Sequence, residues 1–189
     1  MRYLGRFLRF LAGSGNRYSV HSPYLYNFID EVFRKDSRQD NFRPIERLRK
    51  DYLSSKESLM KTDYGRKTIQ DEPAVYQVQL SSIARGSLTS PASARRLHRL
   101  AKYIQAENML EIGTSLGLTT AYLALSNSVN NVITLEGCPE LCRIARENHH
   151  KPNLPGIEVI EGRFEQTLAE ALAKLGKVDL VYIDGNHHK

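Results

Sequence analysis

The sequence predicts an α/β protein in which a parallel sheet follows a helical extension. Short apolar runs alternate with amphipathic helical segments between residues 109 and 183, which is the pattern of βαβ units. Glycine or a polar residue directly follows each of these apolar runs. Residues 1–104 instead show apolar positions at helical spacing, separated by polar breaks. These observations predict a boundary near residue 88, with a helical region over 1–88 and the α/β domain over 89–189.

The first half of the chain predicts helices. Ser22 and Pro23 give an N-cap and a proline at the first helical position, which is typical of a helix start. The apolar spacing predicts four helices, over residues 23–33, 44–59, 73–84 and 91–104.

The second half predicts alternating strands and helices. Strands are predicted over 109–112, 132–135, 157–160 and 178–183, and helices over 118–125, 139–148 and 165–175. Because strand–helix–strand connections are right-handed, the four strands should form one parallel sheet.

Composition and charge exclude several classes of protein. No apolar run approaches the about 20 residues of a membrane helix, and two cysteines make no disulfide framework. We therefore expect a cytoplasmic protein without a membrane span. Residues 1–105 carry a net charge of +10 and residues 106–189 carry −4. A basic first half can meet nucleic acid, but these charges are dispersed, which favours solvated helix faces. Cys138 and Cys142, near His149 and His150, lack a familiar zinc spacing, which favours a packed helix face.

Candidate binding residues follow the predicted strands. In a parallel sheet, ligands bind beyond the carboxyl ends of the strands, where loops from different strands meet. The first strand is followed by Gly113, Thr114, Ser115 and Gly117, the second by Glu136 and Gly137, the third by Gly162, Arg163 and Phe164, and the fourth by Asp184 and His187. Such residues at four strand ends indicate a site more strongly than any single motif.

The loop after the first strand indicates a nucleoside ligand. Gly113 allows a sharp turn after the strand, and Gly117 is expected to let a ligand approach the next helix. Glu136 ends the next strand, where an acid can accept hydrogen bonds from ribose hydroxyls. Ser115 occupies the second glycine position of the dinucleotide motif, which disfavours NAD.

These segments also resemble a known family. The runs MLEIGTSLGLTTAYLA, VITLEG, IEVIEGRF and VDLVYIDGNHHK are similar to the first half of a class I S-adenosylmethionine-dependent methyltransferase. The likeness is to the bacterial branch that resembles small-molecule O-methyltransferases, and it covers about residues 89–189. The resemblance implies a Rossmann-like sheet with strand order 3-2-1-4 and S-adenosyl-L-methionine as cofactor.

The resemblance also implies roles for single residues. Glu111 and Gly113 would line the methionine part of the cofactor, and Thr119 would bond its carboxylate. Glu136 would hold the ribose. The adenine would be bordered by Gly162, Arg163 and Phe164. Asp184 would face the cofactor amino group or a metal, and His187 would be the catalytic base. The remaining cofactor-binding candidates are Thr114, Ser115, Gly117 and Gly137.

Two departures from the family pattern affect these roles. Many class I enzymes place an acid after the third-strand glycine, where this chain has Arg163, so Glu165 or the backbone would contact the adenine amine. A divalent metal is compatible with Asp184, but metal-dependent relatives take ligands from a loop after a fifth strand. The chain stops directly after the fourth strand, so we expect a truncated domain, and the chain alone is expected to lack part of the acceptor pocket. A homodimer through the bare edge strand is a less favoured expectation.

The sequence therefore predicts an S-adenosylmethionine-dependent methyltransferase that transfers a methyl group to an oxygen of a small molecule. Asp184 and His187 are the candidate catalytic residues. The alternatives are an RNA methyltransferase that docks through the basic first half, an NAD-linked oxidoreductase, and a non-catalytic nucleoside-binding module.

Overall fold

The computed structural model describes residues 5–7, 9, 13, 21–35, 42–64, 72–126, 131–150, 154 and 156–185. The chain forms two compact units, residues 1–36 and 37–189. The boundary near residue 88, which the sequence suggests, stays a prediction. Within the described ranges, no helix combines the length and the apolar character that crossing a bilayer requires.

The first unit contains a continuous helical stretch over residues 23–34. The α-helix α2 covers Pro23–Phe28 and passes into a π-helical turn, η2, over Ile29–Arg34. The backbone N–H of Leu25 donates to the Ser22 hydroxyl at 3.4 Å, so the predicted N-cap is confirmed.

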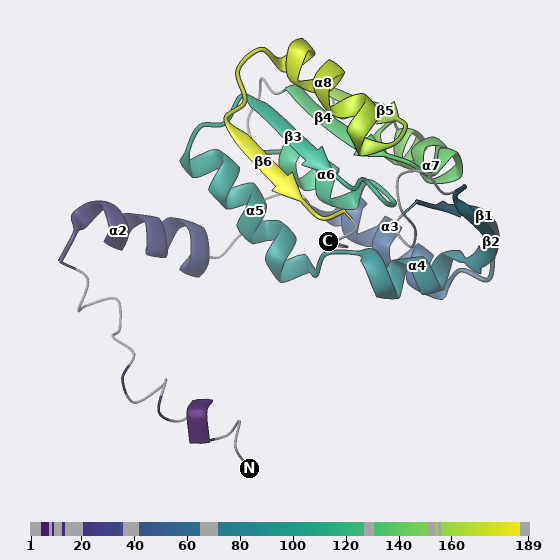
Figure 1. Cartoon of the computed structure of the whole chain (residues 1–189). Helices are drawn as coiled ribbons and strands as arrows, with labels where there is room; N and C mark the ends of the chain where they lie inside the picture. Colours follow the sequence, from purple (N-terminus) through teal and green to yellow (C-terminus); the bar gives the residue numbers. More distant parts are fainter. Residues whose placement is uncertain are drawn as a thin grey trace. The chain divides into compact units, whose positions relative to one another are not determined.

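The second unit is built around a four-stranded parallel sheet (Figure 1). Its strands are β3 (Asn108–Ile112), β4 (Asn131–Glu136), β5 (Ile157–Glu161) and β6 (Leu180–Ile183). The order β5-β4-β3-β6 is the predicted order 3-2-1-4. Glu111 pairs with Thr134 on one side and Tyr182 on the other, so the carboxyl ends of these three strands lie level.

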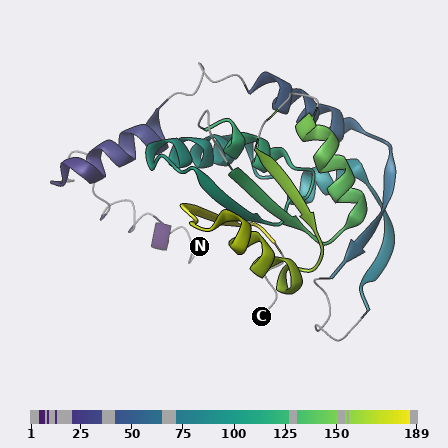
Figure 2. The same ribbon diagram turned by 90° about the horizontal axis from the view of Figure 1, so that it is seen from above.

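Helices cover both faces of this sheet (Figure 2). Helix α8 (Phe164–Leu175) covers one face, where it packs on Leu110, Ile133 and Leu135. The opposite face carries α5 (Pro91–Tyr103), α6 (Leu118–Ala124) and α7 (Pro139–His150). Met109 and Val132 point toward this second layer, because successive residues of a strand face opposite sides. All predicted elements of the second half are confirmed, with ends that differ by a few residues.

Two helices and a β-ribbon adjoin the α6–α7 side. Helix α3 covers Arg43–Ser54, strands β1 (Ser58–Asp63) and β2 (Ala74–Gln79) pair antiparallel, and helix α4 covers Leu80–Ser87. Buried Ile45 of α3, Leu59 of β1 and Ile83 of α4 share one apolar cluster with α6 and α7. This cluster joins the ribbon to the α/β core.

The ribbon corrects two sequence predictions. The helix predicted over 44–59 ends at Ser54. The Ser54 hydroxyl donates to the backbone carbonyls of Lys50 and Asp51 in the last turn of this helix. The helix predicted over 73–84 begins only at Leu80, because residues 74–79 form β2. Those residues alternate between half-buried and exposed positions and are rich in valine and tyrosine, which favours a strand. The region 1–88 is therefore not helical throughout.

Candidate functional site

The sheet brings most of the predicted site residues to one edge. The loop after β3, the first residues after β4 and β5, and the residues after β6 meet at the carboxyl ends of the strands. His187, the predicted base, lies outside the described residues.

Gly113 holds the loop after β3 against the end of β6. Its φ of +102° lies in the region that favours glycine. A Cβ atom there would lie 2.7 Å from the Gly185 nitrogen and 2.8 Å from the Asp184 carbonyl oxygen. Since both atoms belong to the backbone, they cannot swing away. The absence of a side chain at residue 113 thus sets the approach of two strand ends, as predicted for the sharp turn.

Glu136 ties the loop to the end of β4. One carboxylate oxygen accepts the Ser115 backbone N–H at 2.8 Å, and the other accepts the Cys138 N–H at 3.0 Å. Burial raises the pKa of Glu136, and these two donors oppose that rise. Ser115 has a φ of +50°, and this conformation aims its N–H at the carboxylate. The predicted ribose acid is thus held in one orientation by backbone donors.

Glu111 is a fully buried acid beneath this loop. One carboxyl oxygen accepts the Thr120 hydroxyl and the Thr134 hydroxyl, the latter at 2.7 Å. The Thr114 and Thr134 hydroxyls lie 2.6 Å apart and extend this network. The other carboxyl oxygen of Glu111, Oε1, has no hydrogen-bond partner among the described residues. Burial raises the pKa of Glu111 to about 7, and the negative charges of Asp184 and Glu136 add to the rise.

The space beside Gly117 is filled by protein. A Cβ atom at Gly117 would lie 2.5 Å from the Nε2 atom of His149, whose N–H donates to the Gly117 carbonyl at 2.8 Å. This glycine therefore lets α6 pack on α7, and its predicted role in letting a ligand approach the helix stays a prediction. The sequence could not show which helix would lie there. Thr119, in the first turn of α6, is buried as well.

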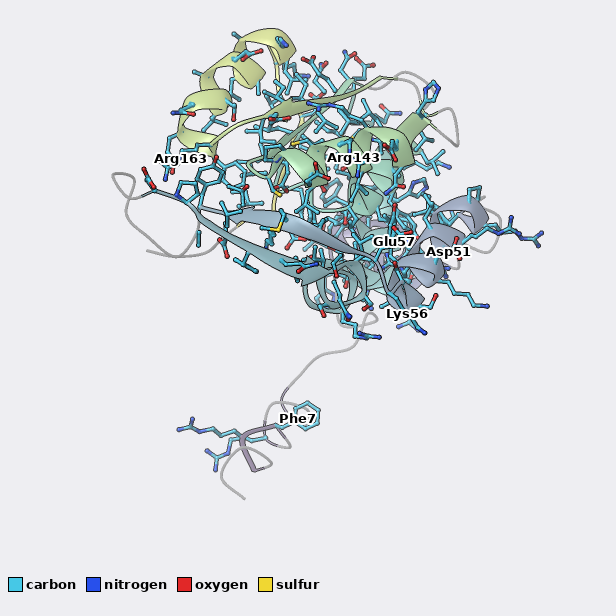
Figure 3. All side chains as sticks on the ribbon, turned by 90° about the vertical axis from the view of Figure 1, so that its right-hand side faces the viewer. Phe7, Asp51, Lys56, Glu57, Arg143 and Arg163 are labelled. Atoms are coloured by element: carbon cyan, nitrogen blue, oxygen red, sulfur yellow. The ribbon has the colours of Figure 1, made fainter. Side chains whose placement is uncertain are left out.

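An aromatic side chain lies beside the predicted adenine residues. The Tyr64 ring packs on Gly137, and the Arg163 guanidinium lies 4.8 Å from the ring centroid. Figure 3 shows Arg163 close to the end of the β1–β2 ribbon. Tyr64 is the residue that follows β1. Phe164 packs on Gly185, so the start of α8 also contacts the end of β6. Gly162, with a φ of +146°, turns the chain from β5 into this region.

The loop between α4 and α5 borders the β6 end of the site. The Thr89 hydroxyl donates to the exposed carboxylate of Asp184 at 3.0 Å and lies 3.2 Å from the Tyr182 hydroxyl. The Ser87 and Ser115 hydroxyls lie 3.0 Å apart. The same short segment therefore contacts the glycine loop and the residue after β6.

Sequence reasoning missed Tyr64 and Thr89. Tyr64 lies between the helices predicted over 44–59 and 73–84, and no local signal tied it to the sheet edge. Thr89 lies two residues before the proline that begins α5, so its sequence context indicated only a helix start.

The cysteines pack in the interior rather than facing a shared ligand. Cys138 and Cys142 are buried and reduced, and each belongs to an apolar cluster. The Cys142 thiol donates to the Glu136 carbonyl, and burial raises its pKa to about 12. The packed-face interpretation of these residues is confirmed. In the part of the chain that the structure describes, no three His, Cys, Asp or Glu side chains gather as metal ligands.

Comparisons with known proteins agree with this architecture. Residues 110–189 match a family model described as a methyltransferase domain. The chain is 30% identical over 100 residues to a catechol O-methyltransferase of Niastella koreensis, covering 51% of this chain and 45% of that protein. It is 33% identical over 123 residues to a catechol O-methyltransferase of Mycobacterium tuberculosis, covering 62% and 55%. The chain thus spans about half the length of the curated relatives it matches.

A solved structure gives the same result. The fold matches an O-methyltransferase from Bacillus cereus, determined in complex with SAH, with a TM-score of 0.51 and 31% identity over 56% of this chain and 51% of that one. The strand order, the glycine loop with its paired acid, and these matches agree on one conclusion. Residues 110–189 are similar to a methyltransferase domain, and the chain is similar to O-methyltransferases over about half of their length.

Proposed function

We propose that this chain binds S-adenosylmethionine at the carboxyl edge of its sheet and is part of an O-methyltransferase. One observation carries the proposal: the Ser115 N–H bonds the Glu136 carboxylate at 2.8 Å. This bond joins the glycine loop of β3 to the acid of β4, so a nucleoside would meet a preformed surface. Ser115 occupies the second glycine position of the dinucleotide motif, and its backbone N–H already donates to Glu136. Both features disfavour binding of a dinucleotide pyrophosphate.

The residues present fit this cofactor. Glu136 keeps further lone pairs on both oxygens and is suited to two ribose hydroxyls. Glu111 has one buried oxygen without a partner among the described residues, which a donor at the methionine end would satisfy. In this proposal Gly113 lines the methionine part, and Thr119 bonds its carboxylate. Gly162, Arg163 and Phe164 border the adenine.

Methyl transfer then requires alignment and removal of a proton. When bound, the cofactor supplies an activated methyl group on sulfonium. Asp184 is held by the Thr89 hydroxyl at 3.0 Å, so its carboxylate has a fixed direction from which to bind the cofactor amino group. His187 is proposed as the base that accepts the proton of the acceptor hydroxyl. Neither role requires a metal ligand set.

We infer that the acceptor is a small hydroxylated molecule, because two relatives are catechol O-methyltransferases. The net charge of +10 on residues 1–105 keeps RNA as the alternative acceptor. A steep loss of RNA binding with added salt would support that alternative. We place the protein in the cytoplasm, where two free buried thiols are usual.

Calorimetric titration of S-adenosylhomocysteine and of NAD into the purified chain tests the proposal. We expect saturable binding of the former alone. Glu136→Ala should weaken it at least about tenfold, since ribose hydrogen bonds to a charged acceptor are worth about 1.5–3 kcal/mol. Glu140→Ala, on the first turn of α7, is the matched control and should bind as the parent does. Equal affinity of parent and Glu136→Ala, or a folded parent that binds neither ligand, contradicts the proposal.

A further inference from the structure

The end of the β1–β2 ribbon places an aromatic ring beside residues of the proposed nucleoside site. Tyr64 directly follows β1, and its ring lies against Gly137, the first residue after the acid Glu136. The Arg163 guanidinium lies 4.8 Å from the centre of the same ring. Tyr64 thus sits between the residue after β4 and the second residue after β5.

A glycine is needed at residue 137 because of the Tyr64 ring and not because of its backbone conformation. Its φ lies outside the left-handed region, so any residue could adopt the same backbone conformation. A Cβ atom at Gly137, however, would lie 2.7 Å from Cδ2 of Tyr64 and 3.0 Å from its Cε2 atom. The glycine therefore makes room for a ring contributed by a residue far away in the sequence.

The ribbon is fastened where it delivers this ring. The Thr62 N–H donates to the Cys138 sulfur at 3.4 Å, and the Cys138 thiol donates to the Met60 carbonyl at 3.9 Å. The Tyr76 hydroxyl donates to the Asp63 carboxylate at 3.2 Å. Because these contacts hold the two residues before Tyr64, the position of the ring is set by the fold.

The chemistry of this arrangement suits a purine. Aromatic side chains bind bases by stacking. A neighbouring guanidinium adds a positive charge, which is attracted to the faces of aromatic rings. Glu136 offers acceptors for ribose hydroxyls one residue before the glycine that the ring covers. We propose that Tyr64 stacks on the purine base of the bound cofactor and so helps to select an adenine nucleoside. This inference rests on the proposed function and names a residue that directly contacts the base.

Tryptophan at this position gives a direct reporter, because the chain contains no tryptophan. In Tyr64→Trp, stacking on adenine should quench the single indole fluorescence in a saturable way as S-adenosylhomocysteine or adenosine is added. A merely structural ring would show no quenching by either ligand. Unchanged fluorescence in a variant that binds the ligand by calorimetry overturns the inference.

Affinity measurements supply the second test. We expect Tyr64→Phe to bind S-adenosylhomocysteine within about twofold of the parent, and Tyr64→Leu to bind it roughly 5- to 100-fold more weakly. Adenosine should lose the same factor, since both ligands carry the purine. Met60→Ala, on an exposed side chain of the same ribbon, is the control and should match the parent.

The remaining outcomes separate this inference from the proposed function. Equal or tighter binding by Tyr64→Leu would mean that the ring only fills space or blocks the site, and it overturns the inference alone. A loss confined to S-adenosylhomocysteine would assign Tyr64 to another part of the cofactor and also overturns it. A folded parent that binds neither ligand overturns the proposed function, and the inference with it.

Discussion

The glycine loop after β3 and the β1–β2 ribbon border the same edge of the sheet, but different forces hold them there. The loop is fixed by its backbone: Gly113 lies in close contact with the backbone of residues 184–185, and the Ser115 N–H donates to Glu136. The ribbon is fixed by side chains, through buried Leu59 and the sulfur of Cys138. One wall of the site therefore depends on backbone conformation and the other on packing.

This difference predicts how each wall responds to mutation. A change in the loop meets backbone atoms or buried acids, so the effect should be large and should extend to folding. A change in the ribbon removes individual contacts, so each effect should follow the burial of the side chain that is lost.

Gly113→Ala should give the largest loss of stability. The new Cβ would clash with backbone atoms at 2.7–2.8 Å, in a left-handed conformation that alanine disfavours. We expect the free energy of unfolding to fall by about 3 kcal/mol or more, measured by urea denaturation. Gly86→Ala is the matched control, because nothing lies within 4 Å of its Cβ position in α4. It should be neutral or stabilising by up to about 1 kcal/mol. Equal effects of the two substitutions would contradict the backbone account of the loop.

Glu111 should make stability depend on pH. The folded-state pKa of about 7 lies above the ordinary value of 4.5, so the folded chain binds this proton more tightly than the unfolded chain does. The resulting stabilisation is complete below about pH 4.5 and is lost as the pH rises through about 7. It amounts to about 3 kcal/mol. The free energy of unfolding of the parent should therefore decrease between pH 4.5 and pH 8.

Glu111→Gln isolates this contribution, because its amide does not titrate in that range. Urea denaturation at several pH values should show a smaller decrease for this variant than for the parent. Glu165→Gln, at an exposed acid in the first turn of α8, should keep the decrease of the parent. Parallel curves for the parent and Glu111→Gln would show that the buried acid is ionised over this whole pH range. They would contradict the prediction that Glu111 makes stability depend on pH.

The same contrast explains what the sequence could predict. Gly113 and Glu136 follow from local patterns, because an apolar strand, a glycine turn and a terminal acid are adjacent in sequence, whereas the strand order was implied by the family resemblance. Their backbone geometry agrees with those predictions, although the roles of the residues in binding stay predictions. The ribbon was predicted wrongly, because Val75 and Val78 fit a helical spacing when they are considered alone. Their composition favours a strand, but pairing with residues 58–63 decides it, and that pairing cannot be read from residues 74–79 alone. Tyr64, Thr89 and the His149 contact to Gly117 were missed for the same reason.

The two faces of the ribbon should respond differently to truncation. Leu59 is 8% exposed and packs in the cluster shared by α3, α4 and α6, whereas the adjacent Met60 is 52% exposed. Leu59→Ala should lower the free energy of unfolding by about 2–3 kcal/mol, through lost burial and a residual cavity. Met60→Ala should change it by less than about 0.5 kcal/mol. Thermal denaturation of both variants measures the difference. Similar small effects would mean that the Cys138 contacts, rather than apolar packing, hold the ribbon.

Thr89 provides the smallest expected effect, because it connects the site to the α4–α5 loop through one hydroxyl. That hydroxyl donates to the Asp184 carboxylate at 3.0 Å, and the acceptor is exposed, so water can replace it in part. Thr89→Val keeps the shape of the side chain and removes the donor. We expect it to weaken S-adenosylhomocysteine binding about fivefold, corresponding to about 1 kcal/mol, with unchanged thermal stability. Thr89→Ser keeps the donor and should bind as the parent does. If valine and serine weaken binding equally, the methyl group rather than the hydroxyl matters, and the β6 end of the site depends on packing as the ribbon does.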